Sequence, residues 1–245
     1  MRYGFISDIH SNLEALETVL KHILSKGGVD RYYCCGDVVG YGPEPNRCLD
    51  IVHEKCKSIV MGNHDHGVLD ARALAYFNSY ARDACIWTRE VLTQENLDVL
   101  KQLTLRCKLD EVSEMVHASP SSPTEEYMLN LYQAEINFHF LTSSICFIGH
   151  THIPMYYVKQ NDTVDLGYFE PERPMMLNKN AYYFINVGSV GQPRDGDPRS
   201  AYGIFDTDEL SFTLYRVPYD IKKTQDKMRE VNLPDYLIDR IERGR

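Results

Sequence analysis

The chain of 245 residues is long enough for one well-buried domain, and its 43% hydrophobic and 25% charged residues exclude a disordered or fibrous protein. Its formal net charge of −9 argues against broad neutralisation of nucleic-acid phosphates, which needs clustered lysine and arginine. The N-terminal sequence MRYGFISD lacks the long apolar run of a signal peptide or a membrane helix, so we expect a cytoplasmic protein without membrane attachment. Seven cysteines, none in a C-x-x-C pair, are expected to be reduced core thiols.

Short apolar runs bounded by polar turns predict strands that are buried on both faces of a sheet. In the first half of the chain such runs cover residues 3–6, 32–35, 59–61, 115–116 and 145–148. The first helix is expected after the first run, with Ser11 and Glu14 as a capping box and Gly27-Gly28 at its end. A second helix is predicted from Pro45 to about Lys55, so the chain begins with the alternating strands and helices of an α/β fold.

Helix-forming composition with apolar periodicity predicts further helices over residues 71–92, 94–103 and 125–141. The runs 182–187, 201–205 and 212–217 are joined by connections too short for a helical crossover, so these strands are expected to be antiparallel. Two helical pieces, 221–231 and 234–242, close the chain. Because no linker-like stretch separates the halves, we predict a single domain over residues 1–245, with a largely parallel first sheet joined to a mixed or antiparallel second one.

Polar side chains directly follow each of the five apolar runs in the first half of the chain. These side chains are Asp8 and His10, Asp37, Asn63 with His64 and Asp65, His117, and His150 with His152. In open α/β sheets the carboxyl ends of the strands form the edge where ligands bind. Taken alone, Asp8 could cap a turn, and His22, His53 and His139 are expected to be packed or solvated. Five of the nine histidines at successive strand ends nevertheless predict one shared site.

Carboxylate, amide and imidazole ligands without thiolate favour hard or borderline divalent ions rather than a cysteine-based structural zinc site. We expect Mn²⁺, Fe²⁺, Zn²⁺ or Ni²⁺, with Mn²⁺ supporting activity in vitro. The ligands are too many for one ion that keeps an open position. Two ions about 3.5–4 Å apart that share one carboxylate would leave room for water, so two divalent metal ions are the working hypothesis.

The five blocks DIH (8–10), GD (36–37), GNHD (62–65), His117 and GHTH (149–152) appear together and in order. They resemble the signature of the calcineurin-like metallophosphoesterase superfamily, and in particular its compact bacterial and archaeal phosphodiesterase branch. The later stretch NVGSVGQPR (186–194) also resembles a loop of that branch. The resemblance implies a four-layer αββα sandwich of two mixed sheets with flanking helices.

The same resemblance implies a role for each matching residue. One metal ion would be bound by Asp8, His10 and His152, the other by Asn63, His117 and His150, with Asp37 bridging the two. His64 would be the general acid that protonates the leaving oxygen, and Asp65 would set its tautomer and stabilise its charged form. A metal-bridging hydroxide would then attack the phosphorus in line, because the two cations offset the negative charge that protects a phosphodiester.

Two features depart from the family pattern. Ala118 follows His117 where the family often has glycine. A helical insertion at about 66–112 is longer than in minimal members. We expect it to pack over the sheet edge, with a lid or dimer surface as the alternative. Arg194 lies on a glycine-rich loop and is the candidate for contacting substrate phosphate, with a surface salt bridge as the alternative.

We therefore expect a dimetal-dependent phosphohydrolase, a phosphodiesterase in first place, that acts on a small phosphate ester or nucleotide. A phosphomonoesterase or protein phosphatase and a dinucleoside-polyphosphate hydrolase are the enzymatic alternatives, since the same metal centre serves all of them. A non-catalytic scaffold is the remaining alternative. We expect no stable nucleic-acid binding and no membrane partner, and the sequence leaves oligomerisation open.

Overall fold

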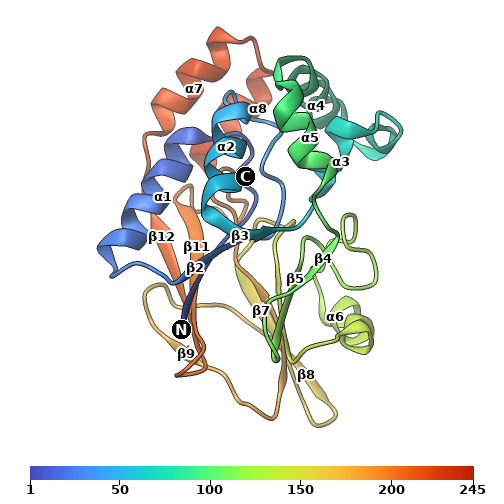
Figure 1. Cartoon of the computed structure of the whole chain (residues 1–245), viewed down its shortest axis with the longest axis vertical. Coiled ribbons are helices and arrows are strands. Elements are labelled where there is room, and N and C mark those ends of the chain that lie inside the picture. Colours follow the sequence, from blue (N-terminus) through green and yellow to red (C-terminus); the bar gives the residue numbers. More distant parts are fainter.

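The computed structural model describes residues 1–245, which form two mixed sheets of six strands each (Figure 1). The first sheet has the strand order β3-β2-β1-β11-β12-β9. Its strands are β1 (Arg2–Ile6), β2 (Arg31–Cys34), β3 (Cys56–Ile59), β9 (Met175–Met176), β11 (Ser200–Asp206) and β12 (Ser211–Val217). Strands β1, β2 and β3 are parallel, whereas β11, β12 and β9 each run antiparallel to the strand before them in that order.

The second sheet has the strand order β4-β5-β6-β10-β7-β8. Its strands are β4 (Arg106–Lys108), β5 (Ser113–Val116), β6 (Ile145–Ile148), β7 (Met155–Gln160), β8 (Thr163–Gly167) and β10 (Tyr182–Asn186). Strands β5, β6 and β10 are parallel, and β4, β7 and β8 are antiparallel to their neighbours. Each sheet therefore contains three parallel strands next to one another.

Alternating side chains place one face of each sheet against the other sheet. Tyr3 and Phe5 of β1 point into the core between the sheets, whereas Ile6 points to the helices outside. The ring of Phe5 stacks on Phe147 of β6 with 3.7 Å between centroids, which joins the two sheets directly. Cys34 and Cys35 point to opposite faces, as the sequence predicts, and all seven cysteines are free thiols.

Helices cover the outer face of each sheet (Figure 1). Helix α1 (Leu13–Ser25) packs on β11 and β12, α2 (Pro45–Lys55) packs on β3, and α7 (Ile221–Glu230) packs on α1. Helix α8 (Asp235–Arg240) adjoins α7, and on the other side of the molecule α6 (Leu131–Asn137) packs on β7 and β8. The expected four-layer sandwich of two mixed sheets is confirmed. None of these helices has the length and hydrophobicity needed to cross a lipid bilayer.

The start of α1 differs from the predicted capping box. Asn12, not Ser11, caps the helix, and its side chain accepts a hydrogen bond from the amide of Ala15. Ser11 has a φ of 55°, a conformation in which its hydroxyl does not reach the helix amides. Glu14 instead forms ion pairs with Lys223 and Lys227 of α7, so it ties two helices together.

Two predicted helices are shorter than expected because asparagine side chains start them late. In the insertion, α3 (Asn63–Leu69) is followed by a 3₁₀ turn (Ala73–Tyr76), α4 (Ser79–Val91) and α5 (Gln94–Lys101). Asn78 caps α4, which divides the predicted helix 71–92. Asn130 caps α6 in the same way, so residues 125–130 are not helical and Phe138–Phe140 forms a 3₁₀ turn.

The tail is only partly as predicted. Strands β11 and β12 are antiparallel neighbours across their short turn, as expected. The prediction that 182–187 pairs antiparallel with 201–205 is wrong, because β10 lies in the second sheet between β6 and β7. The hairpin of β7 and β8 and the edge strands β4 and β9 were not predicted. Their residues are mostly half-buried or exposed, so they lack the continuous apolar run of a buried strand.

Candidate metal centre

The carboxyl ends of the parallel strands from both sheets meet at one edge. Asp8 follows β1 and Asp37 follows β2, while His117 follows β5. The structure forms two groups of ligand atoms, with the atoms of each group within 4.8 Å of one another: Asp8, His10, Asp37 and His152 in one, and Asp37, His117 and His150 in the other. Asp37 belongs to both groups, which is the position expected of a bridging ligand. All six side chains are buried.

The first group brings two imidazoles against two carboxylates. The Nε2 atom of His152 lies 3.2 Å from Oδ1 of Asp8 and also 3.2 Å from Nε2 of His10. The same His10 nitrogen lies 3.7 Å from Oδ2 of Asp37. The four side chains thus point their ligand atoms at a common centre.

The second group has the same character and includes an amide. The Nε2 atom of His117 lies 3.4 Å from Oδ2 of Asp37 and 3.1 Å from Nδ1 of His150. The amide oxygen of Asn63 lies 3.3 Å from the same His117 nitrogen. Asn63 therefore joins this group, as the sequence predicts.

Each of the four histidines uses its outer ring nitrogen to donate to a backbone carbonyl. His10 Nδ1 lies 3.2 Å from the carbonyl oxygen of Val39, and His117 Nδ1 lies 2.7 Å from that of Cys35. The remaining two outer nitrogens, Nε2 of His150 and Nδ1 of His152, meet the carbonyls of Glu125 and Gln192. A carbonyl can only accept, so the outer nitrogens carry the protons.

With the outer nitrogens protonated, the inner nitrogens of His10, His150 and His152 direct lone pairs at one another and at the two carboxylates, and the inner nitrogen of His117 does so once it has lost its second proton. Such lone pairs repel at about 3 Å unless a cation lies between them, and metal-binding histidines are held in this way by carbonyl groups. The donor set of imidazole, carboxylate and amide oxygen without thiolate fits hard or borderline divalent ions. The residues present therefore fit two metal ions.

The backbone that carries these ligands is strained. Asp8, His10, Asp37, His150 and His152 all have positive φ values, between 48° and 65°. Non-glycine residues adopt this region rarely, and such residues persist only where surrounding contacts fix them. Here the amides of Asp8 and His10 donate to the carbonyls of Gly36 and Asp37, so the first two loops hold each other in place.

Gly62 is required for the approach of the Asn63 loop to Asp37. A Cβ atom on Gly62 would lie 2.0 Å from Oδ1 of Asp37 and 2.4 Å from its amide nitrogen. We expect Gly62→Ala to lower the free energy of unfolding by roughly 1–3 kcal/mol, the usual cost of overpacking, and to weaken metal binding. Thermal unfolding of metal-free protein and a Mn²⁺ titration measure the two effects. Gly28→Ala has no neighbour within 4 Å of its Cβ, so it should leave metal binding unchanged, although the φ of 71° at Gly28 makes alanine there lower the stability as well.

His117 carries a proton in the absence of metal. Burial opposes its charging, but the Asp37 carboxylate overrides burial and raises the pKa of His117 to about 9. Burial likewise opposes ionisation of Asp37, yet His117 and His64 hold the pKa of that carboxyl well below its usual range. The two groups thus form an ion pair when no metal ion is bound.

Metal binding must displace that proton from His117. We expect the affinity for Mn²⁺ to rise by about tenfold per pH unit below pH 9, with release of about one proton per protein. Calorimetry in buffers of different ionisation enthalpy measures the proton count. Binding that is independent of pH from 7 to 9 would contradict this state of His117.

The loop 186–192 supports the ligands from behind. Asn186 donates to the carbonyl of Gly149 at 2.6 Å, and the hydroxyl of Ser189 donates to the carbonyl of Asp8 at 2.8 Å. Gln192 supplies the carbonyl that holds His152. The glycine expected after His117 is replaced without a clash, since Ala118 is buried and its amide donates to the carbonyl of Pro123.

His64 lies beside the first ligand group, but Asp65 does not contact it as predicted. The Asp65 carboxylate accepts the amides of Asp37, Val39 and Gly62 at 2.9–3.1 Å, so it fixes two loops instead of a tautomer. The structure therefore shows no hydrogen bond through which Asp65 would set the tautomer of His64. The Nδ1 atom of His64 meets the Sγ atom of Cys85 on α4 at 3.3 Å, a contact that the sequence did not indicate.

Aromatic side chains surround His64. One of them, Tyr41, also lies near Arg194, close to the proposed metal centre. The ring of Tyr41 lies 4.3 Å from that of His64 and 4.7 Å from that of His10. The Arg194 guanidinium lies 5.8 Å from the Tyr41 ring and donates to the side chain of Gln192, with no carboxylate partner. The alternative of a surface salt bridge for Arg194 is therefore wrong. Tyr41 was missed because a lone tyrosine in a loop carries no sequence signal.

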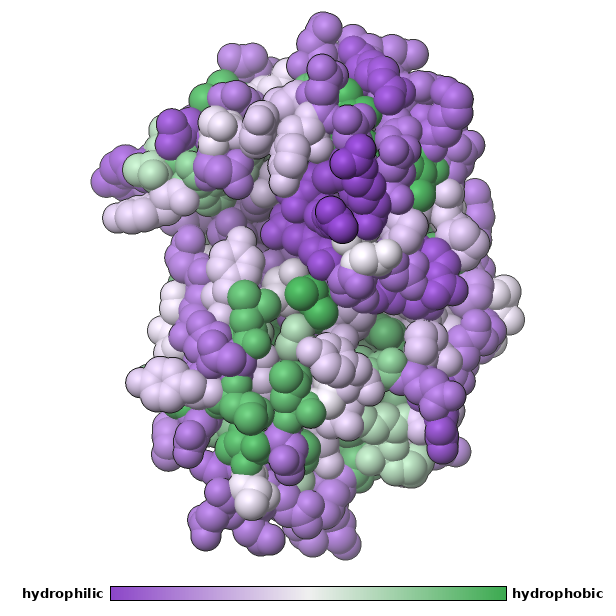
Figure 2. Space-filling view, turned by 180° about the vertical axis from the view of Figure 1, so that it is seen from behind, coloured by the Kyte–Doolittle hydropathy of each residue, from purple (hydrophilic) through white to green (hydrophobic).

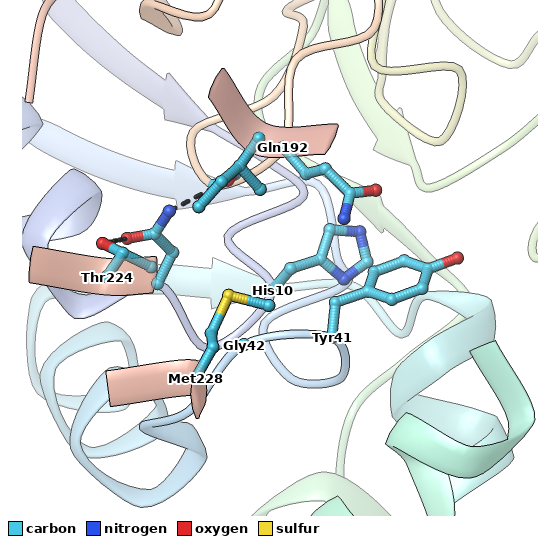
Figure 3. Close-up of a pocket in the computed structure, with 9 residues that line it drawn as sticks. His10, Tyr41, Gly42, Gln192, Thr224 and Met228 are labelled. Carbon is cyan, nitrogen blue, oxygen red and sulfur yellow. Dashed lines mark hydrogen bonds between the residues drawn. The ribbon is translucent and has the colours of Figure 1, made fainter. Parts of the chain in front are cut away.

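Figure 3 shows the side of the centre that faces the C-terminal helices. His10 and Tyr41 lie side by side there, and a cavity of about 10 Å³ separates His10 from Met228 of α7. Thr224 donates to Asn12, which in turn donates to the carbonyl of Gly191. A space of this size holds at most one water molecule, so this side is a supporting wall and the substrate must enter elsewhere.

Comparison with known proteins agrees with this geometry. Residues 1–210 match the family model of the calcineurin-like phosphoesterase superfamily domain. The chain is 40% identical to the protein MJ0912 of Methanocaldococcus jannaschii, over 98% of this chain and 97% of that one. It is 26% identical to the phosphodiesterase YfcE of Escherichia coli, over 86% of this chain and 90% of that one.

Among solved structures, the crystal structure of a metallophosphoesterase from Sphaerobacter thermophilus matches with a TM-score of 0.88 at 39% identity. That match covers 100% of this chain and 99% of the other. The chain therefore belongs to the calcineurin-like phosphoesterase superfamily, which confirms the resemblance of its five sequence blocks and the expectation of a hydrolase that acts on phosphate esters.

Proposed function

We propose that the protein is a two-metal phosphodiesterase whose ligands are Asp8, His10, Asp37 and His152 for one ion and Asp37, Asn63, His117 and His150 for the other. The observation that carries the proposal is the set of four histidines, each fixed by a backbone carbonyl so that its inner nitrogen lies in a ligand group with Asp8 or Asp37. The printed name of the Escherichia coli relative, a phosphodiesterase, supports the preference for diesters.

When bound, the two ions supply positive charge that stabilises the phosphoryl oxygens and activates water as the nucleophile. We propose Mn²⁺, Fe²⁺, Zn²⁺ or Ni²⁺, with Mn²⁺ as the first ion to test. The protein's contribution is rigid placement. The strained loops after β1, β2 and β6 fix the ligands before substrate arrives, so little reorganisation is needed during the reaction.

His64 is the proposed general acid for the leaving oxygen. Its amide donates to Asp37 at 2.8 Å, which places the side chain next to the shared ligand, and its ring is enclosed by Tyr41 and Phe77. Burial lowers the pKa of His64 to about 4 in the metal-free protein. A negatively charged phosphate next to the ring would favour its protonated form, so we propose that substrate binding charges His64.

Arg194 is the proposed contact for a substrate phosphate oxygen. Its guanidinium has no carboxylate partner and is close enough to His152 and His10 to disfavour their protonation. A planar guanidinium can bind two phosphate oxygens at once. The free charge in a chain of net charge −9 indicates a local site for an anion.

The proposed function is tested with a hydrolysis panel on protein loaded with each metal. The panel contains bis-p-nitrophenyl phosphate, p-nitrophenyl phosphate, a cyclic nucleotide, diadenosine tetraphosphate and a phosphopeptide. We expect the diester to have the highest kcat/KM. Preference for p-nitrophenyl phosphate, the phosphopeptide or diadenosine tetraphosphate would favour the corresponding alternative, and silence with both metals bound would favour a scaffold.

A further inference from the structure

A cleft of about 110 Å³ opens beside the second ligand group, and it shares the lining residue Tyr41 with the small cavity of Figure 3. Its buried end is formed by Asn63, His64 and His150. Its walls carry the rings of Tyr41, Tyr76, Phe77 and Tyr127. The cleft therefore leads from solvent to the proposed acid and to two proposed metal ligands.

The aromatic walls come from two separate parts of the chain. Tyr76 and Phe77 belong to the insertion, which projects from the body at the upper right of Figure 1. Seen from behind, the surface is hollowed beneath this projection (Figure 2). Tyr127 comes from the connection between β5 and α6, and its ring stacks on His150 at 3.9 Å between centroids.

Two of these rings have faces that the protein does not cover. Tyr76 is 88% exposed and Tyr127 is 43% exposed, although large aromatic rings usually become buried. The ring of Phe77 packs against that of His64, with 4.9 Å between centroids, so this face of Phe77 is covered by the protein. Tyr76 and Tyr127 are thus available to an outside ring that enters the cleft.

We propose that this cleft binds a flat aromatic ring carried by the substrate, as in a nucleoside phosphate, with Tyr76 and Tyr127 as its stacking surfaces. Stacking suits such a ring because every nucleobase has a π-face. The inference rests on the proposed phosphodiesterase function and extends it by naming the substrate class.

Polar groups in the cleft match the edge of a base better than a second phosphate. Asn78 uses its side-chain oxygen to cap α4, which leaves its amide hydrogens free. The Glu125 carboxylate is exposed and forms no hydrogen bond or ion pair, so it can accept from a ring N–H. The same negative charge disfavours a polyphosphate in the cleft. A substrate with one phosphate at the metal centre and a base in the cleft fits both features.

The insertion therefore has more than the packing role favoured by its composition. Helix α4 and the turn before it contribute Tyr76, Phe77, Asn78 and Ala81 to the cleft, while α5 packs on α2 and α3. One part of the insertion packs on helices α2 and α3, and the other part forms the wall of the proposed subsite.

Binding of adenosine 5′-monophosphate and of ribose 5-phosphate to Mn²⁺-loaded protein tests the proposal by calorimetry. Both ligands carry the same phosphate, so the difference between them reports the base. We expect the nucleotide to bind at least about fivefold more tightly, the lower limit for one base-aromatic stack. In Tyr76→Ala the ratio of the dissociation constant of ribose 5-phosphate to that of the nucleotide should fall to less than about half its wild-type value. The affinity for ribose 5-phosphate itself should not change.

Tyr127→Leu is the second variant, and its manganese content is measured because Tyr127 also touches His150. If its manganese content is normal, Tyr127→Leu should also lose the preference for adenosine 5′-monophosphate over ribose 5-phosphate. Tyr168→Ala is the matched control, since Tyr168 is 67% exposed and does not line the cleft. A preference that survives in both cleft variants, or that is equally reduced in Tyr168→Ala, would overturn the proposal.

The outcome is separable from that of the proposed function. Equal affinity for the two ligands in a protein that hydrolyses bis-p-nitrophenyl phosphate would refute the subsite and leave the phosphodiesterase standing. Preference for the nucleotide that depends on Tyr76, in a protein that hydrolyses no ester of the panel, would establish the subsite and refute the enzymatic proposal.

Discussion

Replacing Asp37 by asparagine is expected to remove at least one metal ion and to lower kcat/KM for bis-p-nitrophenyl phosphate by at least about 10³-fold. Asp37 is the one side chain that belongs to both ligand groups, so its charge serves two ions. Metal ions contribute several kcal/mol of transition-state stabilisation, and each 1.36 kcal/mol is about tenfold in rate. Metal analysis after gel filtration and steady-state kinetics measure the two losses.

The asparagine substitution keeps the shape of Asp37 and can still accept the amide of His64 through its side-chain oxygen. It also removes the negative charge that raises the pKa of His117, so proton release on metal binding should fall as well. Asp162→Asn, at an exposed turn without hydrogen-bond or ion-pair partners, is the matched control. Full activity of Asp37→Asn with two bound ions would show that Asp37 does not bridge.

Replacing His64 by alanine should keep both metal ions and lower kcat by about 10²–10⁴-fold for an ester with a poor leaving group, the usual contribution of a general acid. The loss should be smallest for p-nitrophenolate, which leaves without protonation. A series of diesters with leaving groups of increasing pKa measures this trend, and the variant should show the steeper dependence on leaving-group pKa.

His64 packs against Cys85 and three aromatic rings, so the variant must be shown to fold. Unchanged manganese content and near-ultraviolet circular dichroism supply that control. His139→Ala, at an exposed position of the 3₁₀ turn after α6, should behave like the wild type in the same series. Wild-type rates of His64→Ala with the poorest leaving group would refute the acid role.

The clustering of the proposed metal ligands was predictable because each follows a strand whose end is visible in the local sequence. Asp8, Asp37 and His117 come within two residues of an apolar run, and both sheets turn the carboxyl ends of their parallel strands to the same edge. The assignment of these strands to sheets was less predictable. Strand β10 is as apolar as β11, yet it lies in the other sheet, and only long-range packing decides between the two.

The partners of the site residues were not predictable from residue type. The family resemblance implied that Asp65 holds His64, but its carboxylate accepts the amides of loops that begin near residue 37 and residue 62. Backbone amides and carbonyls are present at every position, so their use leaves no mark in the sequence. Cys85, which does meet His64, lies on a helix whose facing side is set by packing.

The aromatic cleft shows the same limit. Tyr76 and Tyr127 are separated by two helices and two strands in the chain, and neither lies in a recognisable motif. The insertion was expected mainly to pack over the sheet edge because helical composition says nothing of what a connecting turn faces. In the structure the turn that carries Tyr76 lines the same cleft as His150. We therefore propose that the insertion helps to select the substrate.

The central claim, two ions that share Asp37, is tested most directly by anomalous diffraction from crystals of the manganese-loaded protein. The account predicts two separate manganese peaks: one among Asp8, His10 and His152, the other among Asn63, His117 and His150, with Asp37 in contact with both. A single peak in a fully loaded crystal, or two peaks of which only one contacts Asp37, would contradict it.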